Sequence, residues 1–215
     1  MVAVVARPAP SRWPLVAVLG LAAAAAVAFW IIAAFPYLRW DPKQFGELFW
    51  PRRYGLIMHI AGGSIALLVG PLQLWLGETR SKLAWHRTLG TLYLLGVSVG
   101  AAGAFYLSLT TPGARVYAVG LFSLAFTWTV TTGMAYRAIR RRAIDQHREW
   151  MIRSYVVTLA FVVFRAIVAA LTAFGVGTFE ERAGVAAWLC WAVPLVLLEP
   201  CLQWRKARRA ERQAA

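Results

Sequence analysis

The sequence predicts an all-α integral membrane protein, folded as one bundle of six transmembrane helices. Of its 215 residues, 60% are hydrophobic and only 15% are charged, whereas soluble domains are about 45–50% apolar with about a quarter of residues charged. The apolar residues form six stretches of roughly twenty residues, the length that crosses a hydrocarbon core of about 30 Å. Short polar loops separate these stretches, so we expect a single domain over residues 1–215 that is surrounded by lipid.

The six spans are all expected to be helical, because lipid offers backbone groups no hydrogen-bond partners. The first span follows Arg7 and Arg12 and superficially resembles a signal peptide. Its apolar run of about 22 residues exceeds the 7–15 residues of a secretory signal, so we expect an uncleaved helix. The predicted spans cover residues 14–35, 55–76, 88–109, 116–136, 151–174 and 185–204.

The distribution of Lys and Arg predicts the orientation. Sixteen of these residues fall on the side that carries both termini and six fall on the other. By the positive-inside rule, both termini and a basic tail over residues 205–215 are cytoplasmic, and the protein lies in the plasma (inner) membrane. The net charge of +14 therefore belongs to loops and the tail, which argues against nucleic acid as a partner.

A stripe of small and polar residues runs along one face of the second span. It consists of His59, Gly63, Ala66, Gly70 and Gln73, which follow helical spacing. The small residues in its middle are typical of close packing between membrane helices. That packing does not explain the polar residues at the two ends of the stripe.

Depth separates the costly polar groups into two sets. His59 and Arg165 belong to the outer half of the bilayer, where Arg165 needs a partner such as His59, backbone carbonyls or an anion. The depth assigned to Arg165 assumes that one helix runs unbroken from His147 to Arg165. The inner set lies near the cytoplasmic face, with Glu199 joining it from the last span, and contains Gln73, Arg80, His86, His147 and Glu149.

His86 and His147 are the one pair of histidines at matched depth on different helices, as a bis-histidine haem b requires. Gly90 would leave room for the macrocycle, and Tyr93 shares the same face. The propionates would meet basic residues nearby, namely Arg87, Arg148 and Arg153. Three alternatives stay open: an interfacial or packing role, a metal ion bound by His86, His147 and Glu149, and a proton relay.

Several motifs around these residues resemble a family of bacterial multipass membrane proteins that share a domain of unknown function (2306-type). They are GPLQ at 70–73, HRTLGTLY at 86–93 and HREWMIRS at 147–154, together with His59, Gly63 and Arg80. The resemblance implies a membrane bundle with these histidines as its characteristic polar residues. The layout is more loosely similar to transmembrane b-type cytochromes. Those commonly carry two pairs of histidines, and the three present here leave at most one bis-histidine haem.

Two functions follow from these patterns. In the first, the protein is a membrane redox protein with one haem, and His59 and Arg165 form an outer site for a quinone or another small electron partner. In the second, it is a non-enzymatic transporter or an accessory subunit, and the Gly63–Ala66–Gly70 stripe docks a membrane-protein partner or another copy of the chain. The sequence lacks phosphate loops, nucleophile elbows and paired catalytic carboxylates; whether it is an enzyme stays open.

Overall fold

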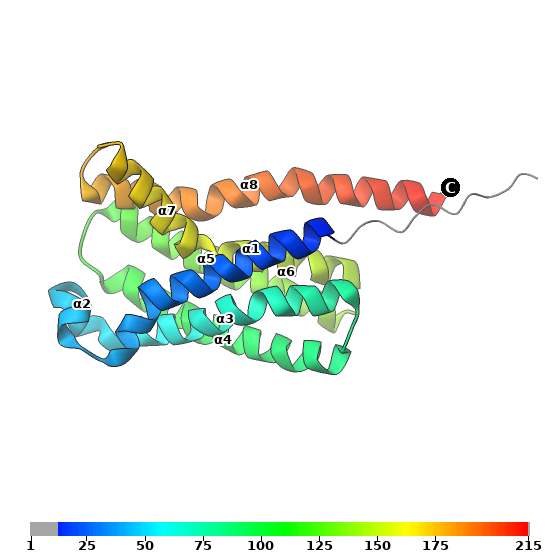
Figure 1. Cartoon of the computed structure of the whole chain (residues 1–215), viewed down its shortest axis with the longest axis horizontal. Coiled ribbons are helices and arrows are strands. Elements are labelled where there is room, and N and C mark those ends of the chain that lie inside the picture. Colours follow the sequence, from blue (N-terminus) through cyan, green and yellow to red (C-terminus); the bar gives the residue numbers. More distant parts are fainter. Residues whose placement is uncertain (1–12, 215) are drawn as a thin grey trace, which may run out of the picture.

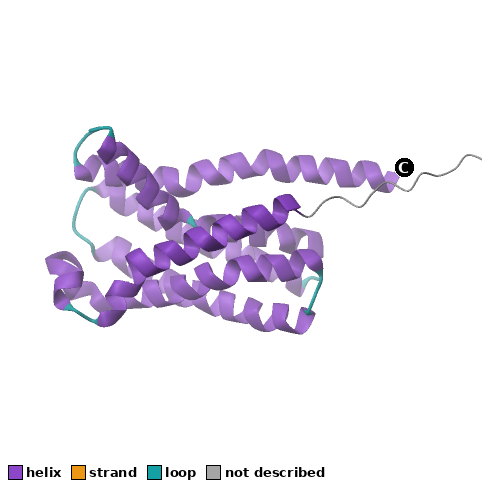
Figure 2. Ribbon diagram, viewed as in Figure 1, coloured by secondary structure: helices purple, strands orange, loops and turns teal. Residues whose placement is uncertain are grey.

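The computed structural model describes residues 13–214, and every regular element in that range is a helix (Figure 2). Six helical segments are long and apolar enough to cross a membrane, as the sequence predicts. Arg7 and Arg12, which precede the first predicted span, lie outside the described residues. The helices are α1 (Trp13–Phe29), α2 (Pro42–Phe49), α3 (Arg53–Thr79), α4 (Leu83–Thr110), α5 (Arg115–Arg140), α6 (Ile144–Thr158), α7 (Ala160–Ala173) and α8 (Phe179–Ala214).

The start of α1 and the end of α8 lie at the same end of the bundle (Figure 1). We name this the inner end and the opposite one the outer end, following the predicted orientation. With 36 residues, α8 is about 54 Å long and extends past the other helices at the inner end. The predicted basic tail is therefore a continuation of this helix as far as Ala214.

The first helix does not stop at Phe29. It continues through a π-helical turn (Trp30–Ala34) and a 3₁₀ turn (Phe35–Arg39), which together complete the first span. The short helix α2, which is not among the predicted spans, follows at the outer end. Its signals are local: Asp41 accepts a hydrogen bond from the Lys43 amide at 3.0 Å, and Pro42 occupies the first helical position.

Helices α3 and α4 pack against each other at very short distance because glycines face each other. A Cβ atom on Gly62 would lie 2.3 Å from the backbone nitrogen of Gly100 and 2.4 Å from the carbonyl oxygen of Gly96. Only glycine permits such an approach of two backbones, which is the packing mode of small residues in membranes. The neighbouring Gly63 has no such contact within 4 Å.

The fifth span is interrupted at Leu159, so the assumption of one unbroken helix from His147 to Arg165 is wrong. Leu159 separates α6 from α7, and α7 runs obliquely to its neighbours (Figure 1). The hydroxyl of Thr158 donates to the carbonyl of Ser154 at 2.9 Å, a back-bond that commonly bends helices. This bend decides where Arg165 lies relative to the rest of the bundle.

Candidate functional site

A cavity of about 540 Å³ occupies the outer half of the bundle. Its wall comes from every long helix and from the turn between α4 and α5, and most of the lining side chains are apolar. His59 and Arg165, which the sequence assigns to the outer half, both line it. We call this space the outer cavity. Its further polar or aromatic lining residues include Tyr117, Trp128, Thr158, Phe161 and Glu180.

His59 is held in one orientation by α4 and by aromatic rings. Its Nδ1 lies 3.0 Å from the carbonyl oxygen of Gly100, and its ring contacts Phe161 and Trp128 at centroid distances of 5.6 and 6.4 Å. A carbonyl oxygen only accepts hydrogen bonds, so Nδ1 carries the proton. In the neutral ring, Nε2 therefore offers a lone pair.

Arg165 brings a positive charge to the same wall. Within residues 13–214 no hydrogen bond or ion pair joins its guanidinium to another group, and its electrostatic neighbour is Tyr117. Glu180 lines the cavity as well, at more than ion-pair distance. Spacing along the chain did not reveal Tyr117, Trp128 and Glu180, because they come from two other helices, α5 and α8.

A buried network of hydroxyl groups forms the floor of the outer cavity. The hydroxyl of Tyr93 lies 2.8 Å from that of Ser154 and 2.9 Å from that of Thr158. Trp128 donates its indole N–H to the Thr158 hydroxyl at 2.9 Å, and Thr132 lies 2.7 Å from Ser154. Tyr93 and Ser154 are fully buried, so the network satisfies polar groups that the apolar core would otherwise penalise.

His86 and His147 meet at the inner end, as the sequence predicts from their depth. Their ring centroids are 6.4 Å apart and the rings are nearly perpendicular, at 86°. Nδ1 of His86 lies 3.2 Å from the carbonyl oxygen of Gln73, and Nδ1 of His147 lies 2.9 Å from that of Ala135. All three histidines of the chain thus donate Nδ1–H to a backbone carbonyl and keep the lone pair on Nε2, which in His86 faces the amide nitrogen of Gln73.

The side chain of Gln73 lies beside this pair. Its Nε2 is 3.5 Å from Nε2 of His86, and a Cβ atom on Gly90 would lie 2.7 Å from the same amide nitrogen. The space that Gly90 leaves is therefore filled by Gln73. The amide oxygen Oε1 of Gln73 is buried and accepts no hydrogen bond, which is costly in an apolar interior.

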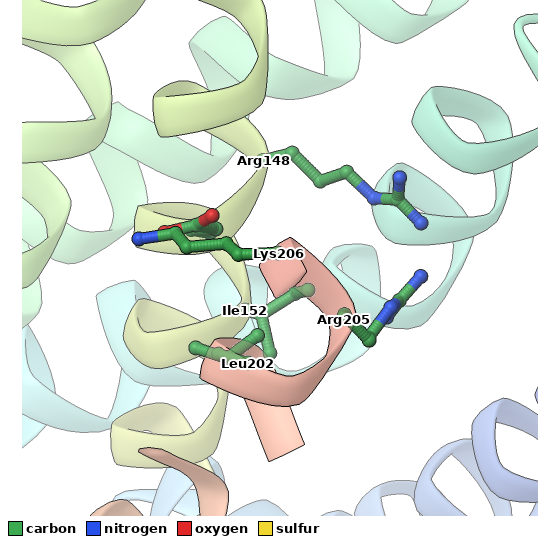
Figure 3. Close-up of a pocket in the computed structure, with 6 residues that line it drawn as sticks. Arg148, Ile152, Leu202, Arg205 and Lys206 are labelled. Atoms are coloured by element: carbon green, nitrogen blue, oxygen red, sulfur yellow. The ribbon is translucent and has the colours of Figure 1, made fainter. Parts of the chain in front are cut away.

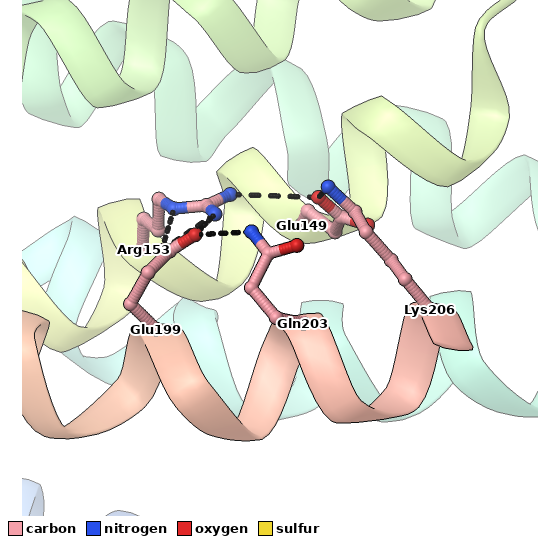
Figure 4. A network of polar contacts seen from close by, with 5 residues as sticks. All are labelled: Glu149, Arg153, Glu199, Gln203 and Lys206. Carbon is pink, nitrogen blue, oxygen red and sulfur yellow. Dashed lines mark hydrogen bonds and ion pairs between the residues drawn. The ribbon is translucent and has the colours of Figure 1, made fainter. Parts of the chain in front are cut away.

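The arginines of the inner end are engaged by carboxylates (Figure 4). Arg153 binds Glu199 at 2.7 and 2.9 Å and lies 3.7 Å from Glu149, which Lys206 also contacts at 2.8 Å. Glu199 thus joins the inner set, as the sequence predicts. These ion pairs tie α8 to α6.

A second set of ion pairs surrounds Glu78 of α3, which pairs with Arg148 and, at 3.6 Å, with Arg205. Figure 3 shows the two guanidinium groups pointing in the same direction. The hollow that they border with Lys206 measures about 20 Å³, enough for about one water molecule. Arg80, Arg87 and Arg165 are exposed, so the expectation that Arg80 and Arg165 are buried polar groups is wrong.

These positions bear on the haem hypothesis. As the side chains stand, Gln73 occupies the space beside Gly90, Tyr93 faces Ser154, and Arg148 and Arg153 are paired with carboxylates. The pair of histidines has suitable spacing, but this arrangement does not fit a macrocycle between them. Among residues 13–214 no three His, Cys, Asp or Glu side chains cluster as metal ligands. Haem ligation by His86 and His147 stays a prediction.

The small-residue stripe of α3 packs inside the protein. Ala66 is fully buried, and a Cβ atom on Gly70 would lie 2.1 Å from the ring of Tyr155. Gly63 lines the outer cavity. The stripe therefore serves contacts within this chain, so it does not provide the surface that docking of a partner requires.

The part of the chain that forms these sites also matches a known protein family. Residues 56–202 match the family described as predicted membrane protein (DUF2306). The chain belongs to this family. The matched region of the DUF2306 protein runs from α3 into α8 and contains all three histidines, three of the five inner ion pairs described above and most of the outer cavity. No curated protein and no solved structure gives a significant match.

Proposed function

We propose that this multipass membrane protein binds a lipid-soluble molecule with an oxygen-bearing ring, of the quinone class, in the outer cavity. The observation that carries the proposal is that His59 and Arg165 line one mostly apolar space. Its volume lies within the ~300–1,000 Å³ of small-molecule sites, which are mostly apolar with a few polar groups that fix orientation. We further infer a plasma-membrane location with cytoplasmic termini, from the basic loops.

The two polar groups suit the two ends of a quinone ring. His59 offers the Nε2 lone pair to a hydroxyl group, as in the reduced quinol, because its Nδ1–H is committed to Gly100. Arg165 has donors without a protein partner and would bind a carbonyl or phenolate oxygen. The aromatic rings of Trp128 and Phe161 flank His59 and would pack against a flat ring.

The test is binding of a short-chain quinone and its quinol to the purified protein in lipid nanodiscs. Arg165→Gln removes the charge, and His59→Asn keeps a donor for the Gly100 carbonyl while removing Nε2. We expect each to weaken binding at least tenfold. Arg115→Gln is the matched control, since Arg115 is exposed at the same end and does not line the cavity. Unchanged affinity in both cavity variants would contradict the proposal.

Haem-dependent electron transfer is the second candidate function, supported by the 6.4 Å spacing of His86 and His147. It ranks below quinone binding because Gln73 would have to leave the space beside Gly90 before a macrocycle could enter. A reducible Soret band in the purified protein that disappears in both histidine variants would support it. If the protein is a transporter, the quinone probe should move between the two membrane leaflets, and Arg165→Gln should slow this movement.

A further inference from the structure

We propose that His86, His147 and Gln73 bind one first-row transition-metal ion, such as Zn²⁺ or Cu²⁺, at the inner end of the bundle. The three side chains come from α4, α6 and α3, and their ligand atoms are Nε2 of each imidazole and Oε1 of the amide. This site shares no residue with the outer cavity, so the inference is independent of quinone binding.

The first support is the way in which each imidazole is anchored. His86 and His147 both direct Nδ1 to a backbone carbonyl, at 3.2 and 2.9 Å. Histidines that ligate metals characteristically donate the other ring N–H to a carbonyl or carboxylate, which fixes the tautomer and orients the ring. Both rings are thus prepared to present the Nε2 lone pair, the form of histidine that a metal binds.

The second support is the distance between the rings. With metal–nitrogen bonds of about 2 Å, two imidazoles on one ion have ring centres roughly 5 to 6.5 Å apart, depending on the angle at the metal. The observed separation is 6.4 Å. This is the separation expected for two imidazoles on opposite sides of an ion, and a tetrahedral ion would require side-chain rotations that bring the ring centres about 1 Å closer. Both histidines are partly exposed, which leaves a route for an ion from the inner surface.

The third support is the unsatisfied oxygen of Gln73. This side chain is 3% exposed, its Oε1 has no hydrogen-bond partner, and its amide nitrogen lies 3.5 Å from Nε2 of His86. A flip of the amide, which exchanges the positions of nitrogen and oxygen, would turn Oε1 toward the ion. Coordination would give this buried oxygen a partner, which the protein alone does not supply. Two imidazoles and one neutral oxygen form a ligand set that suits zinc, copper, nickel or iron.

The nearby carboxylates do not compete for this role. Glu78 pairs with Arg148 and Arg205, and Glu149 pairs with Arg153 and Lys206. Glu149, the carboxylate that the sequence suggests as a ligand, is therefore committed elsewhere. The proposed third ligand is Gln73, whose place in the site depends on the packing of α3 against α4.

The experiment is equilibrium dialysis of the purified, metal-stripped protein against ZnSO₄ or CuSO₄, with the bound metal measured by mass spectrometry. We expect one ion per chain, and at least tenfold weaker binding in His86→Ala, His147→Ala and Gln73→Leu. His59→Ala is the matched control, because His59 has the same Nδ1 anchor without a second imidazole nearby, and should bind like the wild type. If His59→Ala weakened metal binding as much as the other variants, the proposal would be overturned.

A second measurement on the unaltered protein covers the case in which a variant does not fold. Electron paramagnetic resonance of the Cu²⁺-loaded wild type should show hyperfine coupling to two imidazole nitrogens. Fewer than 0.1 ion per chain, a signal without nitrogen coupling, or a Soret band that depends on both histidines would overturn the proposal, the last in favour of haem. Arg165→Gln should leave metal binding unchanged, which separates this test from that of quinone binding.

Discussion

The hydroxyl group of Tyr93 lies 2.9 Å from the hydroxyl group of Thr158. This contact connects α4 to the last residue of α6, immediately before the bend at Leu159. The same Thr158 hydroxyl accepts from Trp128 and donates to the Ser154 carbonyl. One threonine therefore links α4, α5 and α6 at the level where α7 begins. The same threonine lines the outer cavity.

Tyr93→Phe should destabilise the protein by about 1 kcal/mol, because it removes hydroxyl bonds to Ser154 and Thr158 while keeping the ring. The loss is moderate since these two partners keep other hydrogen bonds. Unfolding in mixed detergent micelles measures it. Tyr106→Phe is the control, because Tyr106 is 45% exposed; an equal loss there would show that the network contributes nothing specific.

Gly62→Ala and Gly63→Ala should differ strongly although the two residues are neighbours. A methyl group at Gly62 meets the backbone of α4 at 2.3 Å and forces α3 and α4 apart, at a cost of about 1–3 kcal/mol. A Cβ atom on Gly63 would meet no side chain or neighbouring helix within 4 Å, and alanine favours the helix. Thermal unfolding of both variants tests this, and equal melting temperatures would contradict the close contact.

Arg182→Gln should loosen the turn between α7 and α8. Its guanidinium donates to the carbonyls of Val176 and Gly177, each at 2.6 Å, and to the hydroxyl of Thr172 at 3.1 Å. We expect amide hydrogen exchange over residues 174–178 to rise several-fold, with a change in global stability of about 1 kcal/mol or less. Arg115→Gln should leave exchange in this turn as in the wild type.

The orientation of the bundle is testable with reporter fusions. Because basic residues gather at the end that carries the termini, green fluorescent protein fused after residue 215 should fluoresce, and alkaline phosphatase fused there should be inactive. Insertion of the phosphatase at Gly113, in the turn between α4 and α5, should give an active enzyme. The reverse pattern would invert the inner and outer ends throughout.

The sequence predicted the site in part. Depth along the helices was enough to group His86 with His147 and His59 with Arg165, because rise per residue is constant in a helix. It did not reveal Tyr117 or Trp128, and it placed Arg80 and Arg165 among buried groups although both residues are exposed. Which side chains meet depends on the rotation and tilt of whole helices. The bend at Leu159 could not be predicted from sequence, because no Pro or Gly lies beside it.

The sequence by itself determined that six apolar helices cross a membrane, since the cost of placing an unpaired backbone in lipid leaves no other fold for such stretches. It also determined the asymmetry of charge between the two ends. Only the tertiary structure decided that a Cβ atom would meet α4 at Gly62 and not at Gly63, that Gln73 fills the space beside Gly90, and that α7 runs obliquely along the outer cavity. Those outcomes depend on contacts between helices, which hydropathy and spacing along one chain segment do not encode.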